Sequence, residues 1–367
     1  MKIIYLANIR LPTDKAHGLQ IMKTCEAFAL AGHEIELLVP NRTNDIPESP
    51  FLYYGVEPIF TVTKVQGANL LFFGPPGYLL QNLLFSLVAA KKVRKSNADV
   101  IYGRDESVLY IISLFIHIKL VWESHTGSWN FFVKRLLKSA ASLVVITNGL
   151  KNFYITKGVP TGAVTVAPDG IDLKDFANPE PKEGAKKRLG LPLDKKIAMY
   201  IGRLDGWKGT DTLFKASVYL PSNVQTVVIG GEPLEVAKAK DSYPGITFLG
   251  YRPYKEIADN QSAADVLILP NTATNKISTD FTSPLKLFTY MASNRPTVAS
   301  DLPSIREVLD ETTAVLVEPD SPEALAAGIA KVLDDPATAQ NLAEAAYKKV
   351  QQYTWTNRAK EIVDFIK

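Results

Sequence analysis

The chain has 367 residues, which is enough for two domains that each bury a core of their own. Its hydrophobic fraction of 46% and charged fraction of 22% are typical of a globular protein, and a formal net charge of only +3 argues against a nucleic-acid partner. The single cysteine excludes an internal disulfide framework and, with an N-terminal run typical of a strand rather than a signal peptide, favours a cytoplasmic location.

The first half of the chain alternates short apolar segments with helical patterns. A helix with Ile21, Cys25 and Phe28 on one face follows the first segment, and Gly32 is expected to end it as a left-handed cap. Such alternation predicts a parallel, doubly wound α/β sheet with Cys25 in the core. The strands expected here are 3–7, 35–39, 100–102, 120–122, 143–146 and 164–167.

The same pattern restarts in the second half. A turn cluster at Pro168–Asp172 and the polar, proline-containing stretch Asn178–Lys187 suggest the linker between the domains. The final segment, Thr354–Ile366, has a helical pattern. We therefore expect one domain over 1–170, a second over 171–350 and a terminal helix within 351–367. The strands expected in the second domain are 197–201, 227–229, 246–249, 266–269, 297–299 and 314–317.

Two stretches of the second domain, Gly202–Gly209 and Ser283–Ala292, lie where a strand gives way to a helix. Ser283 is a good N-cap and Pro284 suits a first helical turn, so this helix start is suited to an anion. Arg203 and Lys208 add two cations, and Gly202, Gly206 and Gly209 permit close backbone approach. Together they predict a diphosphate site, the alternative being a solvated surface loop and an ordinary capped helix.

These stretches also carry a resemblance to a known family. GRLDGWKGTDTL and SPLKLFTYMASNRPTVASDLPSIREVL resemble the donor-site motifs of retaining GT-B glycosyltransferases of family 4. Similar patterns recur in AHGLQIMKTCEAFALAGHEIELLVP, VTVAPDGIDLKDF and YTWTNRAKEIVDFI. The resemblance implies two Rossmann-like domains facing across a cleft, an acceptor-side domain over 1–170, a donor domain over 171–350, and a terminal helix over 351–367 that crosses back to the first domain.

The activity implied by the resemblance is sugar transfer with retention of anomeric configuration. The donor would be a nucleoside diphosphate sugar, carrying UDP or GDP, and the acceptor a glycan or a lipid-linked molecule. Arg203 and Lys208 would neutralise the departing diphosphate, and His125 would hydrogen-bond the donor sugar. The implied donor-binding residues are Gly18, Gly202, Arg252, Asp280, Thr282, Ser283, Pro284, Leu285, Lys286 and Thr289.

The chain departs from the family pattern at one important position. The family carries a glutamate that binds the nucleotide ribose where this chain has Thr289. One short hydroxyl is a poorer partner than a carboxylate, which implies weaker nucleotide binding, a water in the gap, or a catalytically silent GT-B protein that acts in binding. A second acidic position of the family falls on Phe281, and the neighbouring Asp280 either substitutes for it or points to the opposite face.

Acceptor-side candidates follow strand ends of the first domain. His125 is the best placed of the four histidines, while Arg104, Glu106 and Glu123 are candidates for acceptor contacts. An apolar run at 78–90 is followed by the basic run 91–95, and 129–138 mixes aromatic with basic residues. Both segments suit either a peripheral helix on the anionic inner face of a membrane or an ordinary helix packed on the sheet.

The sequence also bears on cofactors and rival activities. No His, Cys and Asp cluster has metal-ligand spacing, so neither a metal nor another cofactor is expected. A nicotinamide-dependent enzyme would need a Gly-x-Gly-x-x-Gly turn after the first strand, where this chain has Asn8–Pro12. A sugar-nucleotide epimerase of the same fold would need an acid–base set that the sequence does not reveal.

Overall fold

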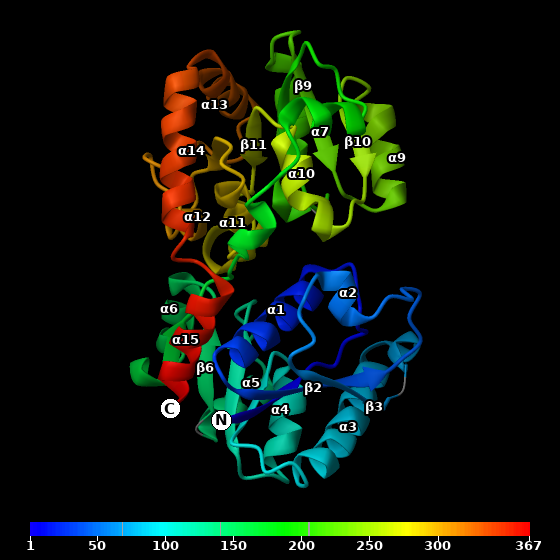
Figure 1. The fold of residues 1–367 in the computed structure, drawn as a ribbon. Coiled ribbons are helices and arrows are strands. Elements are labelled where there is room, and N and C mark those ends of the chain that lie inside the picture. The colour runs from blue at the N-terminus through cyan, green and yellow to red at the C-terminus, as the bar shows by residue number, and fades with distance from the viewer. Residues whose placement is uncertain (68, 140, 205) are drawn as a thin grey trace. The chain divides into compact units, whose positions relative to one another are not determined.

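The computed structural model (Figure 1) describes residues 1–67, 69–139, 141–204 and 206–367, and Asp205 of the GRLDGWKG stretch lies outside the described residues. Two compact units divide the chain. Unit 1 comprises Met1–Ile146, Leu150–Pro168 and Trp355–Lys367; unit 2 comprises Thr147–Gly149 and Asp169–Thr354.

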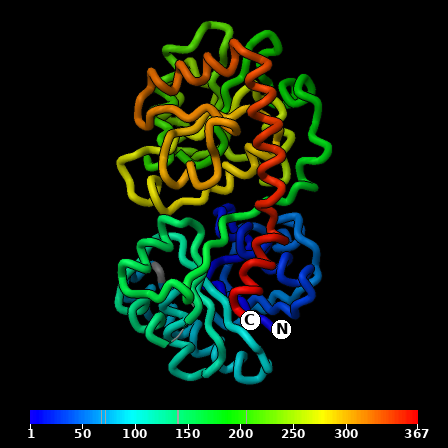
Figure 2. The backbone as a smooth tube through the Cα atoms, turned by 90° about the vertical axis from the view of Figure 1, so that its left-hand side faces the viewer, coloured from blue at the N-terminus to red at the C-terminus, as the bar shows by residue number. Residues whose placement is uncertain are grey.

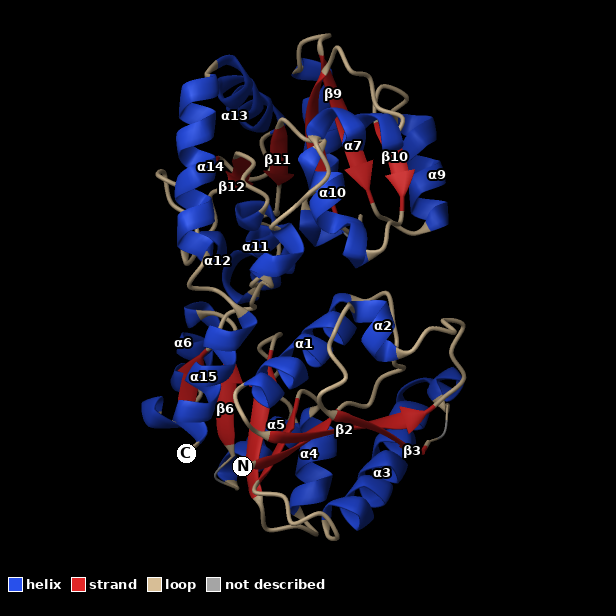
Figure 3. Ribbon diagram, viewed as in Figure 1, coloured by secondary structure: helices blue, strands red, loops and turns tan. Residues whose placement is uncertain are grey.

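Unit 1 is built on a parallel sheet of seven strands in the order β3-β2-β1-β4-β5-β6-β7. Helices lie on both faces, with α1 and α15 on one and α3 and α4 on the other (Figure 3). The expected doubly wound sheet is therefore confirmed. The strands are β1 (Lys2–Leu6), β2 (Glu34–Asn41), β3 (Thr61–Gln66), β4 (Val100–Gly103), β5 (Lys119–Ser124), β6 (Ser142–Val145) and β7 (Val164–Val166); the helices are α1 (Ala16–Leu30), α2 (Pro50–Tyr54), α3 (Gly74–Val93), α4 (Glu106–Ser113), α5 (Phe131–Lys138), α6 (Asn148–Thr156) and α15 (Trp355–Ile366).

Helix α1 ends as its sequence predicts. Gly32 adopts a φ of 84°, and its N–H donates to the Ala29 carbonyl at 2.9 Å. The next N–H, that of His33, donates to the Phe28 carbonyl at 3.2 Å, which completes a Schellman motif. Cys25 is buried in the core, as expected.

The last helix belongs to unit 1. Helix α15 packs against α1, so the two ends of the chain lie near each other, as the N and C labels in Figure 2 show. The Lys119 ammonium donates to the Ile366 carbonyl, and Arg358 reaches inward to Thr24. Unit 1 thus includes a helix from the far end of the chain, more than two hundred positions from its bonding partner Lys119.

Unit 2 repeats the same strand order with six parallel strands, β10-β9-β8-β11-β12-β13. Helices again cover both faces, because consecutive residues of each strand enter opposite cores. In β8, Ile197 and Met199 join one core while Ala198 and Tyr200 join the other. This explains why the strands are apolar throughout. The strands are β8 (Lys196–Ile201), β9 (Val224–Ile229), β10 (Thr247–Gly250), β11 (Val266–Leu269), β12 (Thr297–Ser300) and β13 (Val315–Val317); the helices are α7 (Lys182–Arg188), α8 (Thr210–Ala216), α9 (Pro233–Ser242), α10 (Ile257–Ser262), α11 (Leu285–Ala292), α12 (Pro303–Arg306), α13 (Pro322–Asp334) and α14 (Pro336–Val350).

Two local expectations are wrong. The polar stretch Asn178–Lys187 is not a linker, because most of it enters α7, where Ala185 is fully buried and Lys186 lies 3.9 Å from Asp265. Strand β3 was not expected. Its residues Thr61–Gln66 are mostly polar and partly exposed, as suits the edge of a sheet, so they lack the apolar signature of the other strands.

Candidate functional site

The donor-site candidates of unit 2 gather at the point where its strand order reverses, between β8 and β11. Gly202 and Arg203 directly follow β8, and Asn271 follows β11. In open parallel sheets, ligands bind at the carboxyl ends of the strands beside such a reversal. Gly202 has a φ of 153°, which favours glycine. The expected site therefore falls where this fold places ligands.

Lys286 links the two donor stretches. From the first turn of α11 its ammonium donates to the Tyr200 hydroxyl at 2.8 Å, and that hydroxyl donates to the Arg203 carbonyl at 2.6 Å. A Cβ added at Gly202 would lie 2.8 Å from the Lys286 ammonium. The start of α11 thus sits beside the turn after β8, with a cation between them.

The other two expected cations also lie on this turn. The side chain of Arg203 is exposed, and the Lys208 ammonium stacks 3.4 Å from the centre of the Trp207 ring. Gly209 has a φ of 68°, and a Cβ there would lie 1.7 Å from the Pro270 carbonyl oxygen. The turn therefore packs against the end of β11 at a position that only glycine fits.

The start of α11 differs from its expected cap. Pro284, not Ser283, occupies the N-cap position, and it makes no side-chain capping hydrogen bond. The Ser283 hydroxyl instead accepts a hydrogen bond from the Asp169 N–H at 3.3 Å. Thr282 and Ser283 are both buried, and Leu285 begins the helix. The first N–H groups of α11 therefore receive no hydrogen bond from the side chain at the N-cap position.

Thr289 faces the interior of unit 2. It is 2% exposed, its hydroxyl donates to the Lys286 carbonyl at 3.0 Å and accepts from the Gln261 amide at 2.9 Å. The Gln261 carbonyl oxygen is buried and has no hydrogen-bond partner among the described residues. The hydroxyl at this position is therefore already committed to protein partners.

The remaining donor candidates lie in loops. The Asp280 carboxylate accepts from the Thr279 hydroxyl at 2.8 Å, in a π-helical turn over Ile277–Phe281. Arg252 is exposed just beyond β10. Both positions stay compatible with their expected roles, and neither role is tested by the structure.

Sequence reasoning missed three residues at this edge. Gly230 and Gly231 follow β9 with φ values of 112° and 82°, and a Cβ on Gly230 would lie 2.2 Å from the Gly202 carbonyl oxygen. The Gly-Gly pair after an apolar strand was the available signal. The Asn271 side chain is fully buried, and neither its nitrogen nor its oxygen has a hydrogen-bond partner among the described residues. No sequence pattern distinguishes Asn271 from an ordinary turn residue.

The acceptor-side candidates of unit 1 line a pocket of about 250 Å³. It lies at the carboxyl ends of β1 and β4, again where the strand order reverses. Arg104 donates to the Gln20 side chain at 2.8 Å, and Glu106 accepts from Asn130 at 2.7 Å. The lining includes Asn8, His17, Tyr78, Arg104, Glu106, Glu123 and His125.

His125 is half-buried at this pocket, and its Nε2 lies 2.5 Å from a carboxylate oxygen of Glu123. Burial, reinforced by the charge of Arg104, lowers the pKa of His125 to about 4. The imidazole is therefore neutral at physiological pH. Glu123 is 3% exposed, is hydrogen-bonded to His125 and Tyr102 and forms an ion pair with Arg358. Its carboxylate oxygens are thus engaged by protein groups, whereas it was expected to contact an acceptor.

Gly18 lies in the first turn of α1, which begins at Ala16. A Cβ at this position would lie 2.1 Å from the Tyr54 hydroxyl, which itself donates to the Thr13 carbonyl at 2.7 Å. The small size of Gly18 thus makes room for Tyr54. Its expected role towards the donor stays a prediction.

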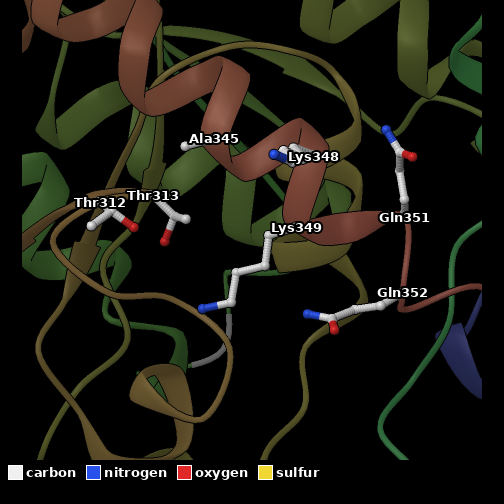
Figure 4. Close-up of a pocket in the computed structure, with 7 residues that line it drawn as sticks. All are labelled: Thr312, Thr313, Ala345, Lys348, Lys349, Gln351 and Gln352. Atoms are coloured by element: carbon white, nitrogen blue, oxygen red, sulfur yellow. The ribbon is translucent and has the colours of Figure 1, made fainter.

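A further pocket, of about 600 Å³, lies elsewhere in unit 2 (Figure 4). Lys349 reaches from α14 towards the loop of Thr312 and Thr313. This loop precedes β13 and so lies at the amino ends of the strands, whereas Gly202 lies at the carboxyl ends. The Lys349 ammonium lies 2.6 Å from the Asp310 carboxylate. Hydrogen bonds from Lys349 and Thr312 lower the pKa of Asp310 to about 2. The Lys349 ammonium in this pocket is thus paired with a carboxylate.

Two surveys concern metals and membranes. Within the described ranges, no cluster of three or more His, Cys, Asp and Glu side chains could hold a metal ion. Across the same ranges, no helix combines the length and the apolar character needed to span a bilayer.

Comparison with known proteins gives two family matches. Residues 181–349 match the model for glycosyl transferases group 1, and residues 19–175 match that for glycosyltransferase family 4. A relative is the putative teichuronic acid biosynthesis glycosyltransferase TuaC of Bacillus subtilis, 27% identical over 69% of this chain and 62% of its own length. The chain thus spans less than two thirds of this relative.

Solved structures match nearly the whole chain. A sucrose-phosphate synthase from Thermosynechococcus elongatus aligns with a TM-score of 0.79 at 20% identity, covering 99% of this chain and 97% of that protein. HepE of Anabaena, solved in complex with UDP and glucose, aligns with a TM-score of 0.78 at 17% identity. The alignment covers 99% of this chain and 98% of that protein. With family matches in both units and this shared architecture, the chain belongs to the group 1 glycosyltransferases of GT-B fold.

Proposed function

We propose that the protein transfers a sugar from a nucleoside diphosphate sugar, with UDP or GDP as the nucleotide, to a glycan or lipid-linked acceptor. The proposal rests mainly on one observation. The Lys286 side chain, at the start of α11, lies beside Gly202 at the point where the strand order of the sheet reverses. The complex of HepE with UDP and glucose supports the nucleotide, and the name of TuaC supports a role in cell-surface polysaccharide synthesis.

In unit 2, the proposed chemistry is stabilisation of the leaving diphosphate. Negative charge grows on that group as the glycosidic bond breaks, so fixed cations stabilise the transition state more than the ground state. Lys286 beside Gly202, with Arg203 and Lys208 on the same turn, would supply these cations without a metal ion. We propose retention of configuration, in which the acceptor attacks from the leaving-group side and the departing phosphate takes its proton.

In unit 1, the pocket at His125 would bind hydroxyl groups. Its lining mixes a neutral imidazole with Arg104 and the carboxylate of Glu106, which are the partners that sugar hydroxyls use. Arg104 and Glu106 are proposed to contact the acceptor, and His125 the transferred sugar.

The test is calorimetric titration of UDP-, GDP- and ADP-sugars into the chain and into Thr289→Glu. Binding by the parent chain supports a working transferase and identifies the nucleotide. Binding only by Thr289→Glu means that the donor site is present but weakened by the threonine. Thr289→Gln, of the same size but uncharged, is the matched control, because only a carboxylate accepts from both ribose hydroxyls.

A catalytically silent binding protein is the second candidate, and Thr289 favours it. Because its hydroxyl is already bonded to Gln261 and to the Lys286 carbonyl, it has little left to offer a ribose. This candidate predicts no donor binding by the parent chain or by Thr289→Glu. That result would overturn the transferase proposal.

We also propose that α3 rests on an anionic membrane surface. The helix differs from an ordinary surface helix, because its buried face includes the polar residues Gln81, Asn82 and Ser86 while five leucines face outward. Gln81 accepts from the Leu70 N–H and Asn82 donates to Ser107, so the buried polar face is satisfied. The exposed leucines are Leu79, Leu80, Leu83, Leu84 and Leu87.

The choice of an anionic lipid surface rests on charge. The last turn of α3 carries Lys91 and Lys92, and basic residues continue to Lys95. An apolar row beside a basic end suits the interface of such a membrane. Vesicles of phosphatidylcholine with phosphatidylglycerol should co-sediment the protein, neutral vesicles should do so less, and Leu80→Glu/Leu83→Glu should abolish it.

Leu234→Glu, at an exposed leucine of α9, is the control and should leave vesicle binding intact. Failure of the parent chain to co-sediment with anionic vesicles would contradict the membrane proposal. A change of oligomeric state in the α3 variant, measured by light scattering, would instead assign the leucine face to a second copy of the chain.

A further inference from the structure

The carboxylate of Glu123 is buried beside the pocket of unit 1 and has three protein partners. One oxygen lies 2.5 Å from His125 Nε2 and 2.9 Å from Arg358 Nη2, and the other accepts from the Tyr102 hydroxyl. Each partner comes from a different segment: Tyr102 from β4, His125 from the loop after β5, and Arg358 from α15. Three distant parts of the sequence thus meet on one carboxylate.

Arg358 is the cation that keeps this carboxylate ionised. It is 4% exposed, donates from Nη1 to the Thr24 hydroxyl at 3.3 Å and lies over the Trp355 ring at 5.9 Å. A buried carboxyl without a cation takes up a proton, because burial disfavours its charged form. Here burial raises the pKa of Glu123, but Arg358 and then His125 outweigh it and hold that pKa well below its usual range.

An ionised Glu123 dictates the tautomer of His125. A carboxylate can only accept hydrogen bonds, so His125 Nε2 must carry the proton. The neutral ring then has its lone pair on Nδ1, and within the described part of the chain no side chain bonds that atom. His125 therefore offers a ligand in this pocket an acceptor rather than a donor.

We propose that Arg358 is a positioning residue that acts through Glu123 to fix the Nε2-protonated tautomer of His125, so that Nδ1 accepts a hydrogen bond from a ligand hydroxyl. The identity of that ligand, a hydroxyl of the sugar or the acceptor, rests on the function proposed above. Glu123 is by the same reasoning a positioning residue, not a contact for the acceptor. The ligand specificity of the pocket then depends on the docking of the C-terminal helix.

The surroundings of His125 agree with a neutral ring. Burial, Arg104 and Arg358 lower its pKa, while the hydrogen bond and charge of Glu123 raise it. Removing Arg358 therefore lets the Glu123–His125 pair bind one further proton, because it takes away a cation that lowers the pKa of both groups. The titratable and charged groups that line the same pocket or meet the same carboxylate are His17, Tyr78, Tyr102, Arg104, Asp105, Glu106, Glu123 and Arg358.

The test is long-range proton–nitrogen NMR of the full chain with labelled histidine, from pH 5.5 to 8. In the parent chain we expect His125 to show the pattern of the neutral, Nε2-protonated ring throughout. In Arg358→Met the pKa of His125 should rise from about 4 by about two units, which brings protonation of the ring into the lower part of this range. Arg358→Lys, which keeps the charge, should restore most of the parent pattern.

Two further variants keep the test decisive. Glu123→Gln should remove the preference for Nε2 even if Arg358→Met fails to fold, and Lys360→Met, at an exposed residue of α15, should leave the spectrum unchanged. An unchanged neutral, Nε2-protonated His125 in Glu123→Gln, or in a folded Arg358→Met, would overturn the proposal.

The ligand arm uses UDP-glucose as the probe. If the probe binds, the Nδ1 signal of the parent chain should shift as that atom accepts a hydrogen bond, and the shift should be lost in Arg358→Met. If the expected tautomer is present but no sugar nucleotide of the calorimetric panel binds, the proposed function fails while the positioning role of Arg358 stands. Binding without any change at Nδ1 would overturn the assignment of His125 as the acceptor.

Discussion

Thr289 has a structural duty that can be measured apart from any ligand. In Thr289→Val the shape is kept, but the buried Gln261 amide loses the hydroxyl to which it donates at 2.9 Å. An unsatisfied buried donor costs about 1–3 kcal/mol, so we expect the free energy of unfolding to fall by about that amount. Denaturant titration measures it, and Thr61→Val, at an exposed strand position, is the matched control. Equal stability of Thr289→Val and the parent would mean that Gln261 finds another partner.

Single residues of the site could be predicted only where the side chain itself carries a charge or an ionisable group suited to the expected ligand. Arg203 and His125 are recognisable in sequence because a charge or an imidazole follows a strand end, and Lys286 because it lies in the first turn of a helix after Ser283 and Pro284. The burial of Glu123 was not, because its cation, Arg358, lies 235 positions later and meets it only after α15 docks. Sequence order hides such a pair, which is why Glu123 was expected to face the acceptor.

The turn between β8 and α8 contains a glycine pair that tests close packing. Gly209→Ala would place a Cβ 1.7 Å from the Pro270 carbonyl oxygen at a φ of 68°. We expect about 1–3 kcal/mol of destabilisation or more, together with loss of donor binding, because the turn would have to move away from β11. Gly206→Ala, three positions earlier, has open space around its Cβ and should be nearly neutral. Similar melting temperatures for the two variants would contradict this account.

Helix α15 is held to the N-terminal sheet by a buried ion pair, which predicts non-additive costs. Arg358→Met leaves the Glu123 carboxylate buried without its cation, a change that typically costs about 3–5 kcal/mol. Adding Glu123→Gln removes the stranded charge and should recover a large part of that loss. Denaturant unfolding of the two single variants and the double variant measures the coupling. Costs that simply add would mean that the pair contributes nothing beyond its separate residues.

Strands could be predicted best where helices cover both faces of the sheet. Strands such as β8 and β11 are apolar throughout because a helical layer covers each side, and their residues could be placed closely. Edge strand β3 is polar and was missed. The polar sequence before α7 looked like a linker because its helix buries only Ala185 and Lys186, so its periodic signal is weak.

The division of the chain into two units follows from its repeated strand order. Each unit has the same reversal point, and the candidate residues of each unit lie at that point of its own sheet. The repeat could be read from the restarting apolar pattern. The crossing at Pro168 falls in the turn cluster Pro168–Asp172, one of the two stretches suggested for the linker, but the local sequence did not favour this cluster over Asn178–Lys187. The chain returns to unit 1 at Trp355, where Arg358 of α15 pairs with Glu123 at the pocket. The stability of unit 1 therefore depends on residues that line this pocket.

That dependence makes acid the expected weak point of unit 1. Burial, followed by the charge of Arg104, lowers the pKa of both His17 and His125 to about 4, against 6.5 for the ordinary side chain. The unfolded chain binds these two protons as pH falls through 6.5, while the folded chain does so only near 4. Stability that is fully present above pH 6.5 is therefore lost between 6.5 and 4.

The slope gives the size of the effect. Each histidine contributes about 1.4 kcal/mol per pH unit inside this window, so His17→Asn and His125→Asn should each flatten the pH dependence of the unfolding free energy by about one proton. Denaturant titrations between pH 5 and 6.5 measure this slope. That range lies above the pH at which Glu123 titrates in the unfolded chain, so the carboxyl does not add to the slope. If His125→Asn keeps the full parent slope, the imidazole is not held neutral, and the acceptor role of its Nδ1 fails with it.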